Sequence, residues 1–265
     1  MNEVGKGQEQ AFTGFTDMEI KVTEPMNFDI KMKLNQMTIT CGENSTGKSL
    51  ANKIIWFISF LASTENVLPQ INLKLDNEFI TRLTKHTFFD SETLSFEGSV
   101  KAREPILNSL IVKVDIKIEK GVCKHFDFQY NGIVSNEIGT PLYLSAETRT
   151  FDNLEKYMEI KSLTGFDPNT DLFSDSRIFE MYKLYDILTF EKILSAFENN
   201  NEVMGEIINV LSSTGILEDF TDTLKELKVE SNKLYMIKQD GEKVRLSTLG
   251  RGTQSMLSML ITAGV

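Results

Sequence analysis

The sequence predicts an α/β protein in which an antiparallel β-subdomain and a helical insertion accompany a glycine-rich loop. Three observations lead to this fold class. Apolar and polar residues alternate in several short segments, which is typical of strands with one solvent-exposed face. The glycine-rich loop stands between a β-rich run and a long apolar helix. Residues 152–227 carry apolar positions mostly at helical spacing.

The composition is that of an ordinary globular protein. The 265 residues are 41% hydrophobic and 25% charged, enough for one large domain or two small ones. Cys41 and Cys123 are the only cysteines, which excludes a disulfide framework and a zinc finger. The longest mainly apolar run, 54–62, is too short to span a bilayer, and the first ten residues do not resemble a secretory signal. We therefore expect a cytoplasmic protein with no membrane segment.

The charge balance limits which kinds of partner the chain is expected to bind. With 28 basic and 38 acidic residues, the formal net charge is −10. Such a balance argues against a chain that coats nucleic acid as a basic sheath, but it leaves room for a local basic groove. With only His86 and His125 in the chain, a multi-histidine metal centre is not expected.

The first part of the chain is expected to be rich in strands. Alternation in 18–22 and 28–34 predicts two half-buried strands, and the β-rich run 37–41 ends at Gly42. The segment 48–61 predicts a helix that is deeply buried, because its apolar residues fill more than one face. Residues 63–105 show no clear pattern.

Further strands follow in the middle of the chain. Alternation over 110–118 predicts a strand with one wet face, paired with 126–130 across a turn at Lys120-Gly121. The residues 142–144 predict a short apolar strand behind Pro141. Asp115 shares the wet face of its strand with Lys113 and Lys117 and is therefore interpreted as a surface residue.

The last part of the chain is expected to be helical and then to form a hairpin. Asp175 or Ser176 is expected to cap a helix that runs to Phe197, and shorter helices are expected at 203–211 and 216–227. The segments 233–238 and 243–246 predict a hairpin, because Asp240-Gly241 between them is a favourable tight-turn pair. A further helix is expected from Met256.

These elements predict four parts. A flexible N-terminus occupies 1–15, and a lobe with the glycine-rich loop and the β-subdomain occupies 16–150. A helical arm is inserted at 151–230. The segment 231–265 then forms a hairpin and returns to the core of the first lobe.

The glycine-rich loop carries the sharpest motif. Gly42-Glu-Asn-Ser-Thr-Gly47-Lys48-Ser49 matches G-x-x-x-x-G-K-[ST] at every fixed position. Its glycines permit torsions that allow successive N–H groups to face phosphate oxygens, and the helix N-terminus adds partial positive charge. In this pattern Lys48 reaches the β- and γ-phosphates and the Ser49 hydroxyl ligates Mg²⁺. The predicted nucleotide-binding residues are Gly42, Glu43, Asn44, Ser45, Thr46, Gly47, Lys48, Ser49 and Leu50.

A second glycine-containing segment stands near the C-terminus, Leu246-Ser-Thr-Leu-Gly-Arg-Gly-Thr-Gln-Ser255. Alone it is compatible with a loop that leads into a helix capped by Thr253. Together with the paired strands, GENSTGKS and the long insertion, it resembles the ABC-type P-loop ATPases of the SMC, RecF and OLD group. The resemblance spans about residues 18–262. The segment Pro141-Leu-Tyr-Leu-Ser-Ala-Glu-Thr-Arg149 is similar to the YLPAxR strand end of many such ATPases, with Ser145 replacing proline and the arginine one place later.

The resemblance implies a mechanism. Members of this group bind ATP with Mg²⁺ and dimerise head to tail, so that each ATP lies between the phosphate loop of one chain and the signature of the other. The signature-like residues here are Ser247, Gly250, Gly252, Thr253 and Gln254, which would face the γ-phosphate held by Lys48 of a second chain. Hydrolysis would then release the dimer. The implied role is in DNA maintenance, repair or anti-phage defence, with a nuclease or other effector as partner.

The group also has an apolar strand that ends in Asp-Glu, the Walker B motif, and such a strand is not found before Val265. Three explanations stay open: the chain is a fragment, a partner ATPase half supplies the missing strand, or the protein is a non-hydrolysing nucleotide-binding regulator. Within the chain, Glu147 and Arg149 are the candidate catalytic residues. A different P-loop kinase or GTPase is the remaining alternative, although no NKxD guanine motif occurs.

Overall fold

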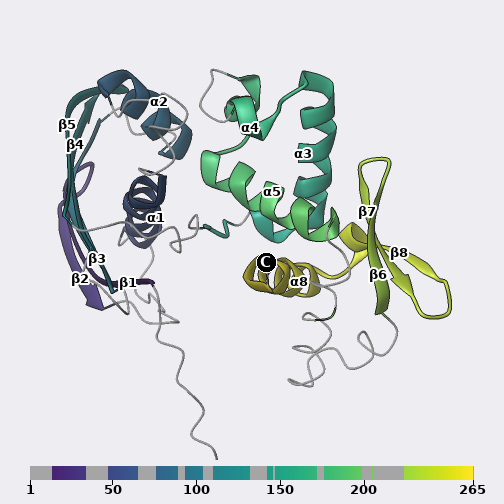
Figure 1. Ribbon diagram of the computed structural model, residues 1–265. Helices are drawn as coiled ribbons and strands as arrows, with labels where there is room; N and C mark the ends of the chain where they lie inside the picture. The colour runs from purple at the N-terminus through teal and green to yellow at the C-terminus, as the bar shows by residue number, and fades with distance from the viewer. Residues whose placement is uncertain are drawn as a thin grey trace, which may run out of the picture. The chain divides into compact units, whose positions relative to one another are not determined.

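The computed structural model shows an α/β protein whose described strands pair in antiparallel fashion (Figure 1). Two compact units divide the chain, Met1–Pro141 and Leu142–Val265. The structure describes residues 14–33, 47–64, 76–88, 93–103, 110–131, 142–145, 147–171, 176–198, 205 and 224–264. The strands and helices in these residues confirm the coarse fold class predicted from the sequence, an α/β protein with antiparallel strands.

The first unit contains a five-stranded sheet in the order β2-β1-β3-β4-β5. Val112, Val114 and Ile116 are buried on one face of β4, and Lys113 is exposed on the other, as the alternation predicts. Lys120 and Gly121 form the turn between β4 and β5, both with positive φ. The strands predicted at 18–22, 110–118 and 126–130 are confirmed, and the strand predicted at 28–34 is confirmed over 28–33, the part that the structure describes. The five strands are β1 (Gly14–Glu24), β2 (Phe28–Lys33), β3 (Thr93–Arg103), β4 (Leu110–Glu119) and β5 (Val122–Asn131).

Two helices, α1 (Lys48–Thr64) and α2 (Asn77–Thr87), cover one face of this sheet (Figure 1). Phe57 and Ile58 of α1 are fully buried. A Cβ on Gly98 of β3 would lie 2.2 Å from Ile58 Cδ1, so a glycine is what allows α1 to approach the sheet at this point. The deep burial predicted for this helix is confirmed.

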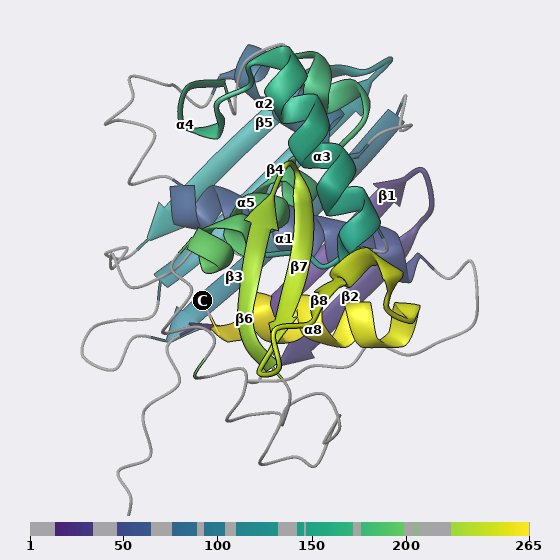
Figure 2. The same ribbon diagram turned by 90° about the vertical axis from the view of Figure 1, so that its right-hand side faces the viewer.

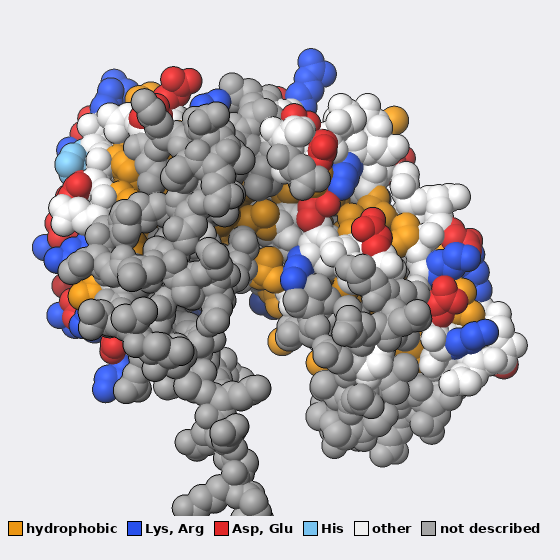
Figure 3. Space-filling model, viewed as in Figure 1, with side chains coloured by type: hydrophobic (Ala, Val, Ile, Leu, Met, Phe, Trp, Pro, Cys, Tyr) orange, Lys and Arg blue, Asp and Glu red, His pale blue; other side chains and the backbone are white. Residues whose placement is uncertain are grey.

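The opposite face of the sheet is charged. Basic and acidic side chains are mixed along the outer side of the sheet, which is seen edge-on at the left of Figure 3. Lys31 lies 3.4 Å from Glu19, and both side chains are largely exposed. Exposed pairs of this kind contribute little to folding, about 0–1 kcal/mol each. The unit is therefore held together mainly by the apolar layer between the sheet and its helices.

The second unit combines helices with a three-stranded antiparallel sheet in the order β6-β7-β8 (Figure 2). The predicted hairpin across Asp240-Gly241 is confirmed as β7 and β8. The elements of this unit are η1 (Glu147–Arg149), α3 (Phe151–Thr164), α4 (Pro168–Asp171), η2 (Arg177–Glu180), α5 (Leu184–Glu198), β6 (Leu224–Glu230), β7 (Lys233–Lys238), β8 (Lys243–Arg245), η3 (Leu246–Thr248) and α8 (Arg251–Gly264).

Aromatic rings fill the space between α3 and α5. Tyr157 is fully buried and stacks on Phe190 with the ring centroids 5.0 Å apart, and Tyr182 meets Phe190 edge-on at 5.5 Å. The Tyr157 hydroxyl donates to Glu191 Oε1 at 2.5 Å, and Lys161 Nζ donates to the same oxygen at 2.6 Å. Burial and the adjacent Glu191 charge raise the pKa of Tyr157, so the hydroxyl remains a donor.

Two predicted helices are corrected by the structure. The segment that was expected to run unbroken to Phe197 is interrupted at 181–183, where Asp186 Oδ2 accepts a hydrogen bond from Lys183 N at 3.2 Å and fixes the start of α5. The side chain of Ser176 makes no capping hydrogen bond. The residues 224–227 were expected to be helical but belong to strand β6. Asp175, most of 203–211 and the residues 216–223 lie outside the described residues.

Candidate functional site

The described part of the glycine-rich loop begins at Gly47. Gly47 has φ +81°, and its carbonyl accepts a hydrogen bond from Ala51 N at 2.8 Å, so the helix begins directly after it. This is the helix start that the motif predicts. The residues 42–46, and the β-rich run 37–41 before them, lie outside the described residues.

Position 47 requires glycine for two separate reasons. A residue with a side chain rarely adopts its φ. A Cβ there would also lie 3.0 Å from Phe28 Cε1 and 3.2 Å from Met26 Sδ. The turn between β1 and β2 therefore packs against the end of the loop and fixes where Lys48 begins the helix.

The first turn of α1 suits an anion. It contains no acidic residue, and the amides at the start of a helix lack partners within the helix. Lys48 and Leu50 are half-buried, and Ser49 is exposed. A lysine and the amide end of a helix, which can donate hydrogen bonds to phosphate oxygens, are thus adjacent in the chain to a hydroxyl that can ligate Mg²⁺.

The signature-like residues form a turn and a helix start. Ser247 lies half-buried in the single turn η3, and Leu246 beside it is fully buried. Gly250 is exposed, and its carbonyl accepts a hydrogen bond from Gln254 N at 3.0 Å. Helix α8 therefore begins at Arg251 rather than near Met256, and Thr253 lies inside the helix instead of capping it.

Gly250 and Gly252 differ from Gly47. Neither has a positive φ, and a Cβ at either position would meet no described atom within 4 Å. Neither the described backbone nor the described packing explains why these two positions are glycine. Glycine is also used where a ligand or another chain approaches the backbone closely, and both residues are exposed at the start of α8.

Gln254 connects the signature-like segment to the start of α3. Its side chain is only 3% exposed. Its Nε2 donates to the carbonyls of Ser247 at 3.1 Å and Leu249 at 2.7 Å, and its Oε1 accepts from Phe151 N at 2.9 Å. Gln254 thus holds the segment in place from inside the unit.

Glu155 of α3 is a second support that the sequence analysis did not single out. Its side chain is 2% exposed. Arg245 contacts both carboxylate oxygens, Leu234 N donates to Oε1 at 3.1 Å, and Ser247 Oγ lies 3.5 Å from each oxygen. Burial raises the pKa of Glu155, but hydrogen bonds from Arg245 and Leu234 N and the charges of Arg245 and Lys233 outweigh burial and lower it below its usual value.

The candidate catalytic residues Glu147 and Arg149 lie in η1, in the second unit. Residues 142–145 before η1 form no strand, contrary to the prediction. Side chains satisfy this backbone where a neighbouring strand was expected: Thr189 Oγ1 donates to Tyr143 O at 3.3 Å, and Arg149 Nη2 donates to Leu144 O at 3.3 Å. The Arg149 side chain is exposed.

Buried hydrogen bonds hold η1 against α5 and α8. Ser145 Oγ donates to Asp186 Oδ1 at 2.5 Å and accepts from Thr148 N at 3.2 Å. Ser258 of α8 donates to Thr148 O at 2.9 Å. The helix that begins at the signature-like segment therefore also contacts the turn that carries Arg149.

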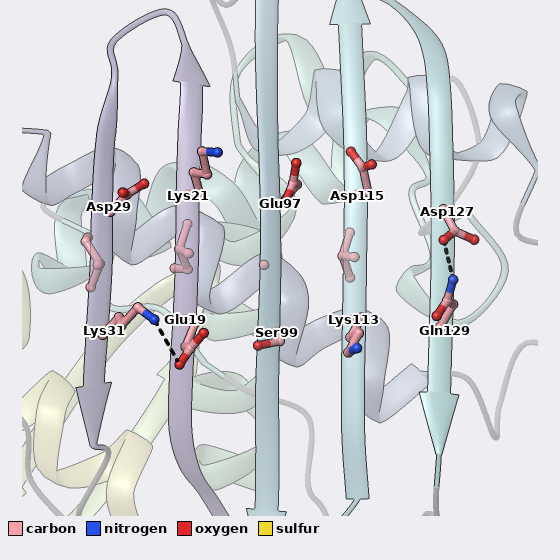
Figure 4. Close-up of a pocket in the computed structure, with 14 residues that line it drawn as sticks. Glu19, Lys21, Asp29, Lys31, Glu97, Ser99, Lys113, Asp115, Asp127 and Gln129 are labelled. Atoms are coloured by element: carbon pink, nitrogen blue, oxygen red, sulfur yellow. Dashed lines mark hydrogen bonds and ion pairs between the residues drawn. The ribbon is translucent and has the colours of Figure 1, made fainter.

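A hollow on the first unit lies on the charged face of the sheet (Figure 4). Its volume is about 480 Å³, and it lies over all five strands. Gln129 donates to Asp127 at 2.6 Å, and Asp115 pairs with His125 at 3.3 Å, which confirms Asp115 as a surface residue. Within the described ranges, no group of three or more His, Cys, Asp or Glu residues is arranged to hold a metal ion.

Comparisons with known proteins add no relative. A scan against protein-family models gives no match to the chain, and a search of curated proteins gives none either. Among the helices that the structure describes, none is long and apolar enough to cross a membrane.

Proposed function

We propose that the chain binds ATP with Mg²⁺ through residues 42–50 and joins a second chain through the signature-like segment, as in an ABC-type P-loop ATPase. The observation that carries the proposal is Gly47. Its left-handed φ leads directly into a helix that starts at Lys48 with no acidic residue in the first turn. A complete G-x-x-x-x-G-K-[ST] pattern at such a turn is what phosphate binding requires.

Each residue has a role in this proposal. The amides at the start of α1 and the Lys48 ammonium bind the phosphates of the nucleotide. The exposed Ser49 hydroxyl contributes a ligand to Mg²⁺, and the ion supplies neutralisation of phosphate charge. Phe28 and Met26 position the end of the loop by packing against Gly47.

The second half of the proposal is supported by the exposed glycines. Gly250 and Gly252 leave the start of α8 uncovered within the described chain. The first turn of α8 contains no acidic residue and includes the exposed Arg251. A phosphate held by a second chain would therefore meet amides, the Ser247 hydroxyl and no repelling carboxylate on the helix.

In this scheme ATP joins two chains head to tail and its hydrolysis separates them. The wider role proposed is the one implied by the resemblance to the SMC, RecF and OLD group: DNA maintenance, repair or anti-phage defence together with an effector protein. A local role for Arg149 near the reacting phosphates is part of the same proposal, because its side chain is exposed on a turn that contacts α8.

Light scattering with and without MgATP tests the proposal. We expect a dimer that forms only with nucleotide and is lost in Lys48→Ala and in Ser247→Arg. Lys53→Ala is the matched control, because Lys53 lies on the same helix outside its first turn. Dimerisation that is independent of nucleotide, or unchanged in both test variants, would contradict the proposed function.

A further inference from the structure

The buried carboxylate of Glu155 interacts with several hydrogen-bond donors. It contacts the Arg245 guanidinium and accepts from Leu234 N, and Lys233 Nζ lies 3.6 Å away. Two cations, Arg245 and Lys233, thus face the Glu155 carboxylate, and Asp152 of the same helix adds a second carboxylate that acts on Arg245. These contacts hold the Arg245 side chain against α3.

The side chains of Arg245 and Ser247 lie close together because both approach the Glu155 carboxylate. Ser247 Oγ lies 3.5 Å from both Glu155 oxygens, and Arg245 Nε lies 3.1 Å from the same two atoms. Glu155 is 2% exposed, but the Arg245 side chain is 38% exposed. The carboxylate therefore lies beneath, and the guanidinium and the hydroxyl lie between it and the surface.

The guanidinium retains donors for a second acceptor. An arginine carries five N–H groups, and the bonds to Glu155 use those on Nε and Nη2. The pairing with Glu155 does not engage Nη1. A guanidinium held on one edge by a buried carboxylate loses little freedom when its other edge binds a phosphate oxygen.

We infer that Arg245 is a further phosphate-contacting residue of the signature-like segment, and that Glu155 is the residue that positions it beside Ser247. The ligand is the terminal phosphate of a nucleoside triphosphate bound by a second copy of the chain. This inference rests on the proposed function, and it adds a cationic contact from strand β8 to the serine and glycines of the signature-like segment.

The same geometry explains how Ser247 would change partners. A hydroxyl has a single proton to donate, and here it faces the Glu155 carboxylate at the outer limit of a hydrogen bond. When a phosphate arrives, Ser247 redirects that proton to the phosphate oxygen. Glu155 keeps Arg245 and Leu234 N as donors, so the buried carboxylate is not left unpaired.

The test measures the ATP-driven dimerisation constant by sedimentation in MgATP, and the ATP affinity of the monomer by calorimetry at low protein concentration. In Arg245→Gln, we expect dimerisation to weaken about 10- to 100-fold, the range for losing a hydrogen bond to a charged group. The ATP affinity of the monomer stays within about twofold. Arg245→Lys, which keeps the charge but not the two-pronged pairing, falls between the wild type and Arg245→Gln.

Glu155→Gln tests positioning rather than contact. If Glu155 acts only through Arg245, the double variant Glu155→Gln/Arg245→Gln dimerises no more weakly than Arg245→Gln alone. The double variant also removes both charges of the pair together, so no lone charge is left buried to unfold the unit. Lys243→Gln is the matched control, because it removes an exposed cation from the same strand.

The outcomes separate this inference from the proposed function. Wild-type dimerisation in MgATP, with Arg245→Gln and the double variant within about twofold of wild type, overturns the inference and leaves the proposed function intact. A weakening in Lys243→Gln equal to that in Arg245→Gln also overturns it, because general charge would then be the cause. Wild-type protein that binds no MgATP overturns both.

Discussion

The two motif-bearing helix starts are supported in different ways. Helix α1 begins at Lys48 and is fixed by apolar packing: Phe57 and Ile58 are buried against the sheet, and Gly47 packs on Phe28. Helix α8 begins after Gly250, and buried polar groups fix the segment before it, chiefly Gln254 and the carboxylate of Glu155. The start of α1 therefore depends on close apolar packing, whereas the signature-like segment depends on directional, charge-dependent bonds.

Phe57→Ala should lower the free energy of unfolding more than the other variants, because it removes apolar packing beneath α1. Removing a fully buried phenylalanine costs about 3–5 kcal/mol of unfolding free energy. Denaturant unfolding followed by the fluorescence of Trp56, the single tryptophan, reports on this helix directly. Val122→Ala, at a half-exposed position on β5, is the control and should change stability by less than about 0.5 kcal/mol. Equal effects for the two variants would contradict the dependence on packing.

Glu155→Gln should lower the free energy of unfolding by about 1.5–3 kcal/mol at neutral pH, because hydrogen bonds between charged groups are lost. The pKa of Glu155 is lowered in the folded state, so its contribution is present above the unfolded pKa and is lost as the pH falls through the folded value. The stability gap between wild type and Glu155→Gln should therefore narrow below about pH 4.3. Urea unfolding at several pH values measures this, and a gap that does not change with pH would contradict it.

Gly47→Ala should cost about 1–2 kcal/mol for the left-handed φ alone, and more because of the contact with Phe28. Gly121→Ala is a matched control: its φ is +71°, but no atom lies within 4 Å of the added Cβ. The difference between the two variants in thermal unfolding isolates the crowding against Phe28. If Gly121→Ala is the more damaging of the two, the packing account of the loop is wrong.

Gly252→Ala should change the free energy of unfolding least among these variants, and it should raise this free energy rather than lower it. The added Cβ meets nothing in the described chain, and alanine is favoured over glycine in a helix by about 0.5–1 kcal/mol. Unfolding should show unchanged or higher stability, while MgATP-driven dimerisation weakens because the methyl group obstructs the approaching phosphate. Stronger or unchanged dimerisation would show that this glycine does not face a second chain.

Much of the first unit could be predicted from the sequence, and the missed elements have physical explanations. Strand β3 was not recognised because Gly98 occupies a buried position where an apolar residue was expected, and Ile58 of α1 fills that space instead. Helix α2 was missed because Thr84 and Thr87 are buried within it and bond to its own carbonyls, so the apolar stripe is incomplete.

Strand β6 shows why spacing can mislead. Leu224 and Leu227 are three residues apart, which suggests a helix. A register shift between Leu224 and Glu226 lets both leucines be buried on a strand. Such irregularities leave no simple signal in a single sequence.

The candidate site also has one part that the sequence predicts and another that it does not. Residues Gly47 to Ser49 follow from a motif whose local geometry is encoded within eight consecutive residues. Glu155, Arg245 and the bonds of Gln254 bring together segments separated by about 90 to 100 positions. The only available signal was a glutamate placed next to Leu154 on the apolar side of a helix, and the sequence does not identify its partner.

Calorimetric titration of MgATP into the well-folded chain, with Lys48→Ala and Lys53→Ala beside it, tests the central claim most directly. We expect saturable heat for wild type and Lys53→Ala, and none for Lys48→Ala at the same concentrations. If wild type gives no heat with MgATP or MgGTP, or if Lys48→Ala binds as tightly as wild type, residues 42–50 do not hold a nucleotide.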